Sequence, residues 1–185
     1  VSRITIARKS VQLRVPARQQ RVASLELHPP ILDAPWVCMD GMEPRQRDLA
    51  LGVLRESLSP GGFDTVRNSM MLNGATGEML GSEEEYGEWL YWLSVMGTPS
   101  SDAPWGWQLD GHHMIINCFV PGDQVVMTPM FMGSEPVKVD TGKFAGTRAY
   151  DAEVQGALKL GQSLSTGQRS KAILGTELPP DVFTS

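Results

Sequence analysis

Apolar residues recur at helical spacing after residue 44. In the segment that opens at Pro44, charged residues alternate with an apolar stripe formed by Leu49, Val53, Leu54 and Leu58. This spacing is typical of an amphipathic helix, which Ser59-Pro60-Gly61-Gly62 would end. A second helix is predicted from Phe63 to about Leu72, because Asn73-Gly74 and Thr76-Gly77 then read as breaks.

Further helices are predicted on both sides of a central region. Ser82 precedes three glutamates, residues 83–85, and a hydroxyl cap followed by acidic residues is typical of a helix start. Tyr86, Leu90 and Leu93 would face inward from that helix. Two more helices, at about 151–164 and 166–174, would close the chain and bury Val154, Leu158 and Leu164.

The central region has the rhythm of strands. The best candidate runs from Gln108 to Val120, and Pro121-Gly122-Asp123 would turn it into a second strand at Gln124–Met127. Residues 91–96 also read as extended, and 128–148 read as a structured loop with one short strand near 137–139. The fold class is therefore α+β, with a small, mainly antiparallel sheet (hairpin at about 108–127) packed against several helices.

The charge divides the chain at its N-terminal end. Residues 1–30 contain six Lys or Arg and one Glu, whereas the rest contains 10 basic and 20 acidic residues. We expect a basic, peripheral or partly ordered leader over residues 1–39, with a short helix at 16–27, and a single globular domain over 40–185. The overall charge of −5 argues against a nucleic-acid partner, because such proteins present a basic surface to phosphates.

Two other features bear on the class of protein. No apolar run approaches the roughly 18 residues of a membrane span, and no signal-peptide core is evident, so we expect a soluble chain and assign no compartment. The two cysteines, Cys38 and Cys118, match no metal-binding spacing. Buried free thiols are the favoured interpretation, and a disulfide stays open.

Side chains suited to recognition or catalysis concentrate between Trp89 and His113. Four of the five tryptophans and two of the three histidines fall there. On a continuous strand His112 and His113 would point to opposite faces, so one metal ion could bind both only if Gly111 formed a bulge. Asp110 on the face of His112 could orient that imidazole for proton transfer.

The other face and the following loop supply further candidates. His113 and Asn117 could line a pocket beside Trp105 or Trp107, whose large rings suit a small organic ligand. Gln108, on the face of His112, is a further candidate for ligand binding. Glu135, in the loop 133–136, could reach over the strands as an acid, a base or a metal ligand beside His113. A divalent metal, a metal-free pocket and purely structural histidines all stay open at this point.

The motifs resemble one known family. The run Gly97–Asn117, with Pro104-Trp-Gly-Trp-Gln-Leu-Asp-Gly-His-His113 at its centre, is similar to the domain of unknown function 3500, as are Thr128–Pro136, Gly146–Arg148 and the helix openings at 42–50 and 168–169. The resemblance covers about residues 40–185. It implies a fold neighbourhood without a reaction, and a longer C-terminal side in other members, so this chain would be a truncated version.

The favoured function is an enzyme or enzyme-like domain that acts on a small organic molecule. Its catalytic residues would be His112, His113, Glu135 and Asp110, and its ligand-binding residues Trp105, Trp107, Gln108 and Asn117. A metal, if present, would bind His113 and Glu135. Two alternatives stay open: a binding module without catalysis, and a protein interaction domain with a Met-rich surface.

Overall fold

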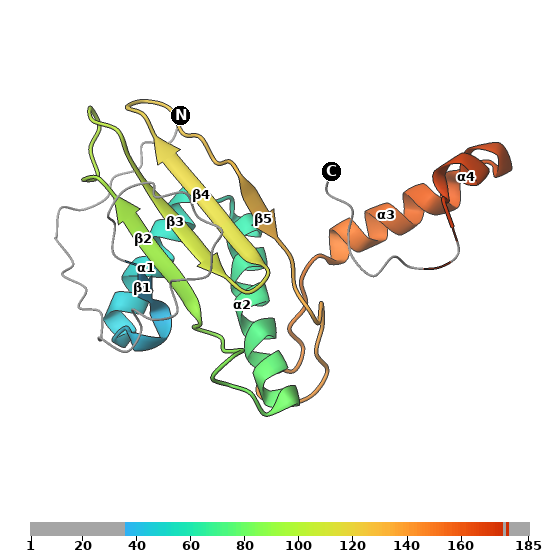
Figure 1. The fold of residues 1–185 in the computed structure, drawn as a ribbon, viewed down its shortest axis with the longest axis horizontal. Helices are drawn as coiled ribbons and strands as arrows, with labels where there is room; N and C mark the ends of the chain where they lie inside the picture. Colours follow the sequence, from blue (N-terminus) through green and yellow to red (C-terminus); the bar gives the residue numbers. More distant parts are fainter. Residues whose placement is uncertain (1–35, 176, 178–185) are drawn as a thin grey trace. The chain divides into compact units, whose positions relative to one another are not determined.

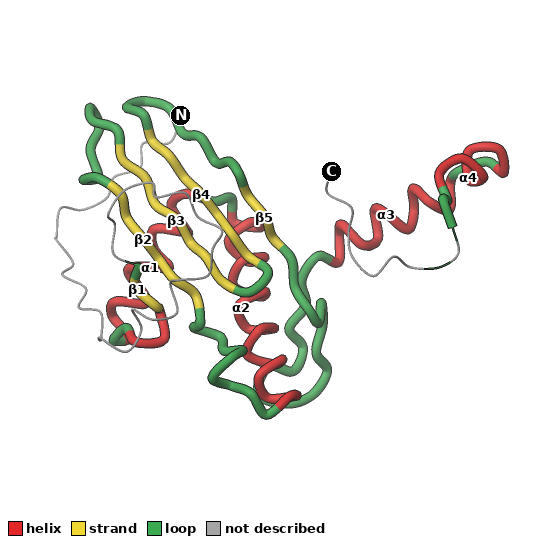
Figure 2. Tube along the Cα trace, in the orientation of Figure 1, coloured by secondary structure: helices red, strands yellow, loops and turns green. Residues whose placement is uncertain are grey.

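The computed structural model describes residues 36–175 and residue 177. They form two units, one ending at Ala149 and one starting at Tyr150, which are described separately. Figures 1 and 2 show the elements: β1 (Val37–Cys38), the 3-10 turn η2 (Met39–Gly41), α1 (Pro44–Ser57), α2 (Pro60–Leu80), β2 (Tyr91–Met96), β3 (Trp105–Gly111), β4 (Met114–Val120), β5 (Met130–Met132), α3 (Asp151–Ser163) and α4 (Thr166–Ala172). The predicted α+β class is confirmed. The prediction of one domain over 40–185 stays a prediction.

The five strands form one antiparallel sheet in the order β1-β2-β3-β4-β5. The segment Gln108–Val120, predicted as one strand, contains parts of two, because the chain reverses at His112–His113 and Gly111 pairs with Met114. After β4, Pro121-Gly122-Asp123 does turn the chain, and Val126 forms an isolated bridge with Phe119. The unpredicted edge strand β5 then pairs with β4.

Helix α1 begins as predicted but buries a different side. The backbone N–H of Glu43 donates to the Gln46 side chain at 2.8 Å, which is half of a capping box. The predicted stripe is partly wrong, since Leu49 is 50% exposed and the buried residues are Ala50, Leu51 and Leu54. The helix is rotated by about one residue relative to the predicted stripe, so that Ala50, Leu51 and Leu54 pack into the core.

Helix α2 is much longer than predicted and continues through Asn73-Gly74 and Thr76-Gly77 to Leu80. A Cβ at Gly77 would lie 2.0 Å from the carbonyl oxygen of Tyr86, and one at Gly74 would lie 2.7 Å from the Phe144 ring. These glycines therefore permit close packing, which outweighs their poor helix propensity. The third predicted helix is wrong: residues 82–90 form successive turns that run along α2.

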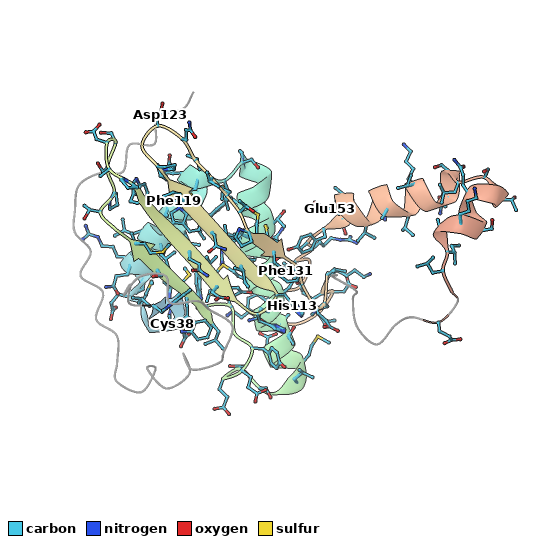
Figure 3. The ribbon with its side chains drawn as sticks, turned by 45° about the horizontal axis from the view of Figure 1, so that its top comes forward. Cys38, His113, Phe119, Asp123, Phe131 and Glu153 are labelled. Atoms are coloured by element: carbon cyan, nitrogen blue, oxygen red, sulfur yellow. The ribbon has the colours of Figure 1, made fainter. Side chains whose placement is uncertain are left out.

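The main hydrophobic core lies between the sheet and the two helices, which cover one face of the sheet (Figure 1). Side chains alternate along each strand, so every second residue of β3 and β4 enters this core. The inward residues of these strands are Trp105, Trp107, Leu109, Met114, Ile116, Cys118 and Val120. The opposite face carries exposed apolar side chains such as Phe119 and Phe131, which Figure 3 labels.

The second unit contains two helices whose ends agree closely with the prediction. Helix α4 opens with a full capping box, in which Ser165 and Gln168 exchange hydrogen bonds of 2.9 and 3.3 Å. The predicted inward residues are not buried within the described chain, since Val154 is 42% and Leu158 52% exposed. Helix α3 therefore forms where it was predicted, but none of its residues is buried within the described chain.

Cys38 and Cys118 are both buried and free, which confirms the favoured interpretation of the two thiols. Burial raises the pKa of both thiols, as expected when a low-dielectric environment disfavours the thiolate. Across the residues that the structure describes, no helix is both long enough and apolar enough to cross a membrane.

Candidate functional site

The two histidines form the tight turn between β3 and β4. His113 has a positive φ of 58°, a conformation tolerated by a few polar residues in turns. Gly111 precedes the turn, and a Cβ there would lie 2.3 Å from the ring of Tyr91, so no larger residue fits. Because the two residues form a turn, their side chains do not point to opposite faces as they would on a strand. Both imidazoles lie at the same end of the sheet, and their ring centroids are 3.9 Å apart.

This turn, helix α2 and the loop after β5 border a shallow polar pocket. The pocket is partly open to solvent and is lined by Ser69, Asn73, His112, His113, Gly133, Ser134 and Glu135. No Lys or Arg belongs to this lining. The site therefore brings together two imidazoles and one carboxylate from segments about 20 residues apart in sequence.

His112 is the more firmly held of the two imidazoles. Its Nδ1 lies 2.9 Å from Oδ1 of Asn73, which is only 4% exposed. The Tyr91 hydroxyl donates to the His112 carbonyl oxygen at 3.3 Å, and the Tyr86 ring meets the imidazole edge to face with centroids 5.1 Å apart. Ring and backbone are thus both restrained, although the residue as a whole is exposed.

His113 faces the loop that carries Glu135. Its Nε2 lies 3.7 Å from Oε2 of Glu135, too far for a hydrogen bond, and that buried nitrogen has no hydrogen-bond partner among the described residues. Glu135 itself is 85% exposed at the mouth of the pocket. Figure 3 shows His113 at this end of the sheet, with Phe131 on the adjacent edge strand.

The backbone of this loop is anchored at two points. The N–H of Gly133 donates to the carbonyl oxygen of His113 at 2.7 Å, and the Thr76 hydroxyl donates to the carbonyl oxygen of Glu135 at 2.7 Å. The first bond ties the loop to the histidine turn and the second ties it to α2. The Glu135 backbone is thereby fixed beside the histidine turn, while the Glu135 side chain is 85% exposed.

The surroundings of His112 favour its neutral form. Partial burial of the ring lowers the pKa of His112 below its ordinary value of 6.5, the neighbouring His113 lowers it further, and the Glu135 carboxylate opposes both effects. The direction follows from burial, since desolvation penalises the charged imidazolium. His112 is therefore a neutral imidazole at pH 7, able to accept a proton or to donate a lone pair.

This pKa shift predicts how stability depends on pH. Because the folded-state pKa of His112 lies below the unfolded value, the unfolded chain binds the proton first as the pH falls. The free energy of unfolding should decrease from about pH 6.5 downward through the lowered folded-state pKa. Urea unfolding of the wild type and His112→Asn at several pH values checks this, and equal pH slopes in the two proteins would contradict it.

The remaining predicted site residues lie elsewhere on the sheet. Gln108 and Asn117 pair across β3 and β4 on the face away from the helices, where Asn117 donates to the carbonyl oxygen of Pro129 at 2.8 Å. Asp110 shares that face and does not line the pocket. Trp105 and Trp107 are core residues, 7% and 0% exposed, and neither lines the pocket beside His113.

Four pocket residues were absent from the predicted site: Ser69, Asn73, Gly133 and Ser134. A signal for the first two existed, because Ser69, Asn73 and Thr76 are spaced by four and three residues and so share one helix face. That signal depended on α2 continuing past Asn73. The predicted helix break at Asn73-Gly74 concealed it.

The predicted metal ligands, His113 and Glu135, do lie near each other. Within residues 36–175 and 177, however, no three His, Cys, Asp or Glu side chains form a group that could hold a metal ion. Two ligands are fewer than the three protein ligands that catalytic zinc sites usually supply. Acid–base chemistry is what the arrangement can perform with its own groups.

Comparison with known proteins leads to one family. Searches of curated proteins and of solved structures found no match. A family model described as "Protein of unknown function (DUF3500)" matches residues 7–185, and so extends further toward the N-terminus than the motifs that carried the resemblance. The chain belongs to this DUF3500 family.

Proposed function

We propose that the chain is an enzyme in which His112 acts as a general base on a small, uncharged or cationic polar molecule. The observation that supports this most directly is the convergence of His112, His113 and Glu135 in one polar pocket. The base would take a proton from water or from a ligand hydroxyl. General-base catalysis of this kind contributes about 10²–10⁴-fold to a rate.

The state of His112 suits this role. A base must be unprotonated at the working pH, and burial beside His113 lowers the pKa of His112. His113 and Glu135 would serve the ligand rather than the proton transfer. The buried Nε2 of His113 lacks a partner among the described residues, so a ligand that reached it would satisfy a nitrogen that is costly to leave unpaired.

Size and charge define the ligand class. The pocket is a shallow hollow without enclosed space for a water-sized molecule, so a small molecule, or one end of a larger one, would bind across its open mouth and not inside a cavity. The lining contains one carboxylate and no Lys or Arg. An anion would therefore meet repulsion from Glu135 without a compensating cation, whereas a hydroxyl or ammonium group would find acceptors.

Hydrolysis of chromogenic substrates tests the proposal. We expect turnover of the uncharged p-nitrophenyl acetate, little turnover of the anionic p-nitrophenyl phosphate, and a rate at least about 100-fold lower in His112→Ala. Glu84→Ala is the control, because Glu84 is an exposed carboxylate outside the pocket. Equal rates in the wild type and His112→Ala would contradict a catalytic role for His112.

The same assay separates the proposal from its rivals. The rate should survive EDTA, because the proposed base requires no metal. Loss of activity in EDTA, together with stoichiometric metal that disappears in His113→Ala, would instead favour a metal site at His113 and Glu135. A ligand that raises the melting temperature without being converted would favour a binding module.

A further inference from the structure

Asn73 is the buried polar residue in direct contact with an imidazole of the site. It lies in the middle of α2 and is 4% exposed. Its side-chain Nδ2 donates to the carbonyl oxygen of Gly87 at 2.9 Å, and its Oδ1 lies 2.9 Å from Nδ1 of His112. Both ends of this amide are therefore engaged.

These two contacts determine where the proton on His112 resides. The Gly87 carbonyl can only accept a hydrogen bond, so it must face the NH₂ end of the Asn73 amide. The oxygen end then faces His112 and also can only accept, so Nδ1 of the imidazole must carry the hydrogen. In neutral His112 the lone pair is consequently at Nε2.

We propose that Asn73 is a positioning residue that holds His112 in the Nδ1–H tautomer and leaves Nε2 as the reactive nitrogen. The role of Nε2 as a base rests on the function proposed above, whereas the tautomer itself does not. Many hydrolytic sites contain a residue that orients the base in this way and sets both the tautomer and the ring direction of its imidazole.

The fold fixes Asn73 through the segment that carries Gly87. The glycines at 74 and 77 let this segment approach the helix, with a Cβ at Gly74 only 3.1 Å from the backbone nitrogen of Glu88. Next to it, two guanidinium groups lie over the Trp89 ring, with Arg47 at 4.9 Å and Arg67 at 4.6 Å from the ring centroid. These cation–π contacts and the packing of the glycines hold the Gly87 carbonyl in place.

An ion pair adds a further restraint on the same segment. Arg67 donates to the Glu88 carboxylate at 2.8 Å, and both side chains are largely buried, at 18% and 14% exposed. Arg67 therefore joins α2 to the residue that follows Gly87. The orientation of Asn73, and through it the tautomer of His112, depends on this packed framework and not on local sequence.

Nitrogen NMR of protein labelled in its histidines tests the proposal directly, because Nδ1 and Nε2 have different shifts in each tautomer. We expect His112 to be in the Nδ1–H form above its pKa in the wild type and to lose that preference in Asn73→Leu, which removes the acceptor. Asn68→Leu is the matched control: Asn68 lies on the same helix and donates to the Arg148 carbonyl oxygen at 2.9 Å, away from His112. The control should leave the His112 tautomer unchanged.

A second variant keeps the test decisive if Asn73→Leu fails to fold. Asn73→Asp retains an acceptor and adds a negative charge, so the Nδ1–H tautomer should persist and the pKa of His112 should rise by about 1–2 units. The titratable side chains beside His112, namely Tyr86, His113 and Glu135, are the same in all variants. A tautomer unaffected by Asn73→Leu, or a pKa unaffected by Asn73→Asp, would overturn the proposal.

The outcome separates this inference from the proposed function. If Asn73 sets the tautomer but His112→Ala leaves turnover unchanged, the positioning role stands and the catalytic role of His112 fails. If both hold, Asn73→Leu should lower kcat by at least about tenfold with a smaller effect on KM, since both polar ends of this pocket-lining amide bond to Gly87 and His112 and neither is left for a ligand.

Discussion

Replacing Trp107 with alanine should lower the free energy of unfolding by about 3–5 kcal/mol, the usual cost of removing a large aromatic side chain from a packed interior. The Trp107 ring is 0% exposed and belongs to the core between the sheet and the two helices. Removing it would leave a cavity that the surrounding core side chains cannot fill without moving.

Chemical unfolding by guanidinium, followed by circular dichroism, measures this loss. Trp92→Ala is the control, because Trp92 is only half-buried, on the strand next to β3; it should cost clearly less. A Trp107→Ala protein within about 1 kcal/mol of the wild type would show that the ring is dispensable to packing. That result would reopen the predicted role of this tryptophan in ligand binding.

Substituting alanine for Gly77 should destabilise the protein by about 3 kcal/mol, although alanine is the better helix former by about 1 kcal/mol. The added Cβ would lie 2.0 Å from the carbonyl oxygen of Tyr86, and backbone on both sides prevents a cheap adjustment. Helix α2 and the following turns would have to separate. Separation would also displace Gly87, the partner of Asn73.

The matched control is Gly52→Ala in helix α1. A Cβ at Gly52 meets nothing within 4 Å. Only the higher helix propensity of alanine then changes the stability, so the melting temperature should rise slightly. The two variants make the same chemical change in a helix and should shift stability in opposite directions. Two shifts of the same sign would contradict the close approach between α2 and residues 83–86.

Local patterns were sufficient for several elements. Proline at the first turn and the Gln46 side chain mark the start of α1, and the Ser165–Gln168 capping box marks the start of α4. These features involve residues three or four apart, so nothing distant is needed to form them. The antiparallel character of the sheet followed from the short turn predicted at Pro121-Gly122-Asp123, although only Val126 of the strand expected after it pairs with β4, in an isolated bridge with Phe119.

The candidate site was only partly accessible in the same way. His112, His113 and Glu135 were identified from the sequence as residue types suited to proton transfer. The glycines before them, Gly111 and Gly133, indicated which segments could hold the site. Their geometry was mistaken because alternation was extended through residues that in fact form a turn. A single turn of two residues changes which side chains share a face.

The sequence by itself determined the fold class, the start of most helices and the segment that contains the histidines, since each depends on contacts between near neighbours. Only the tertiary structure decided that α2 continues through Asn73-Gly74, because the glycines are required by segments packed against them and not by the helix. It likewise decided that Trp107 is core and that Asn73 meets His112 across 39 residues of chain. Such long-range contacts arise when elements pack together, and no local pattern encodes them.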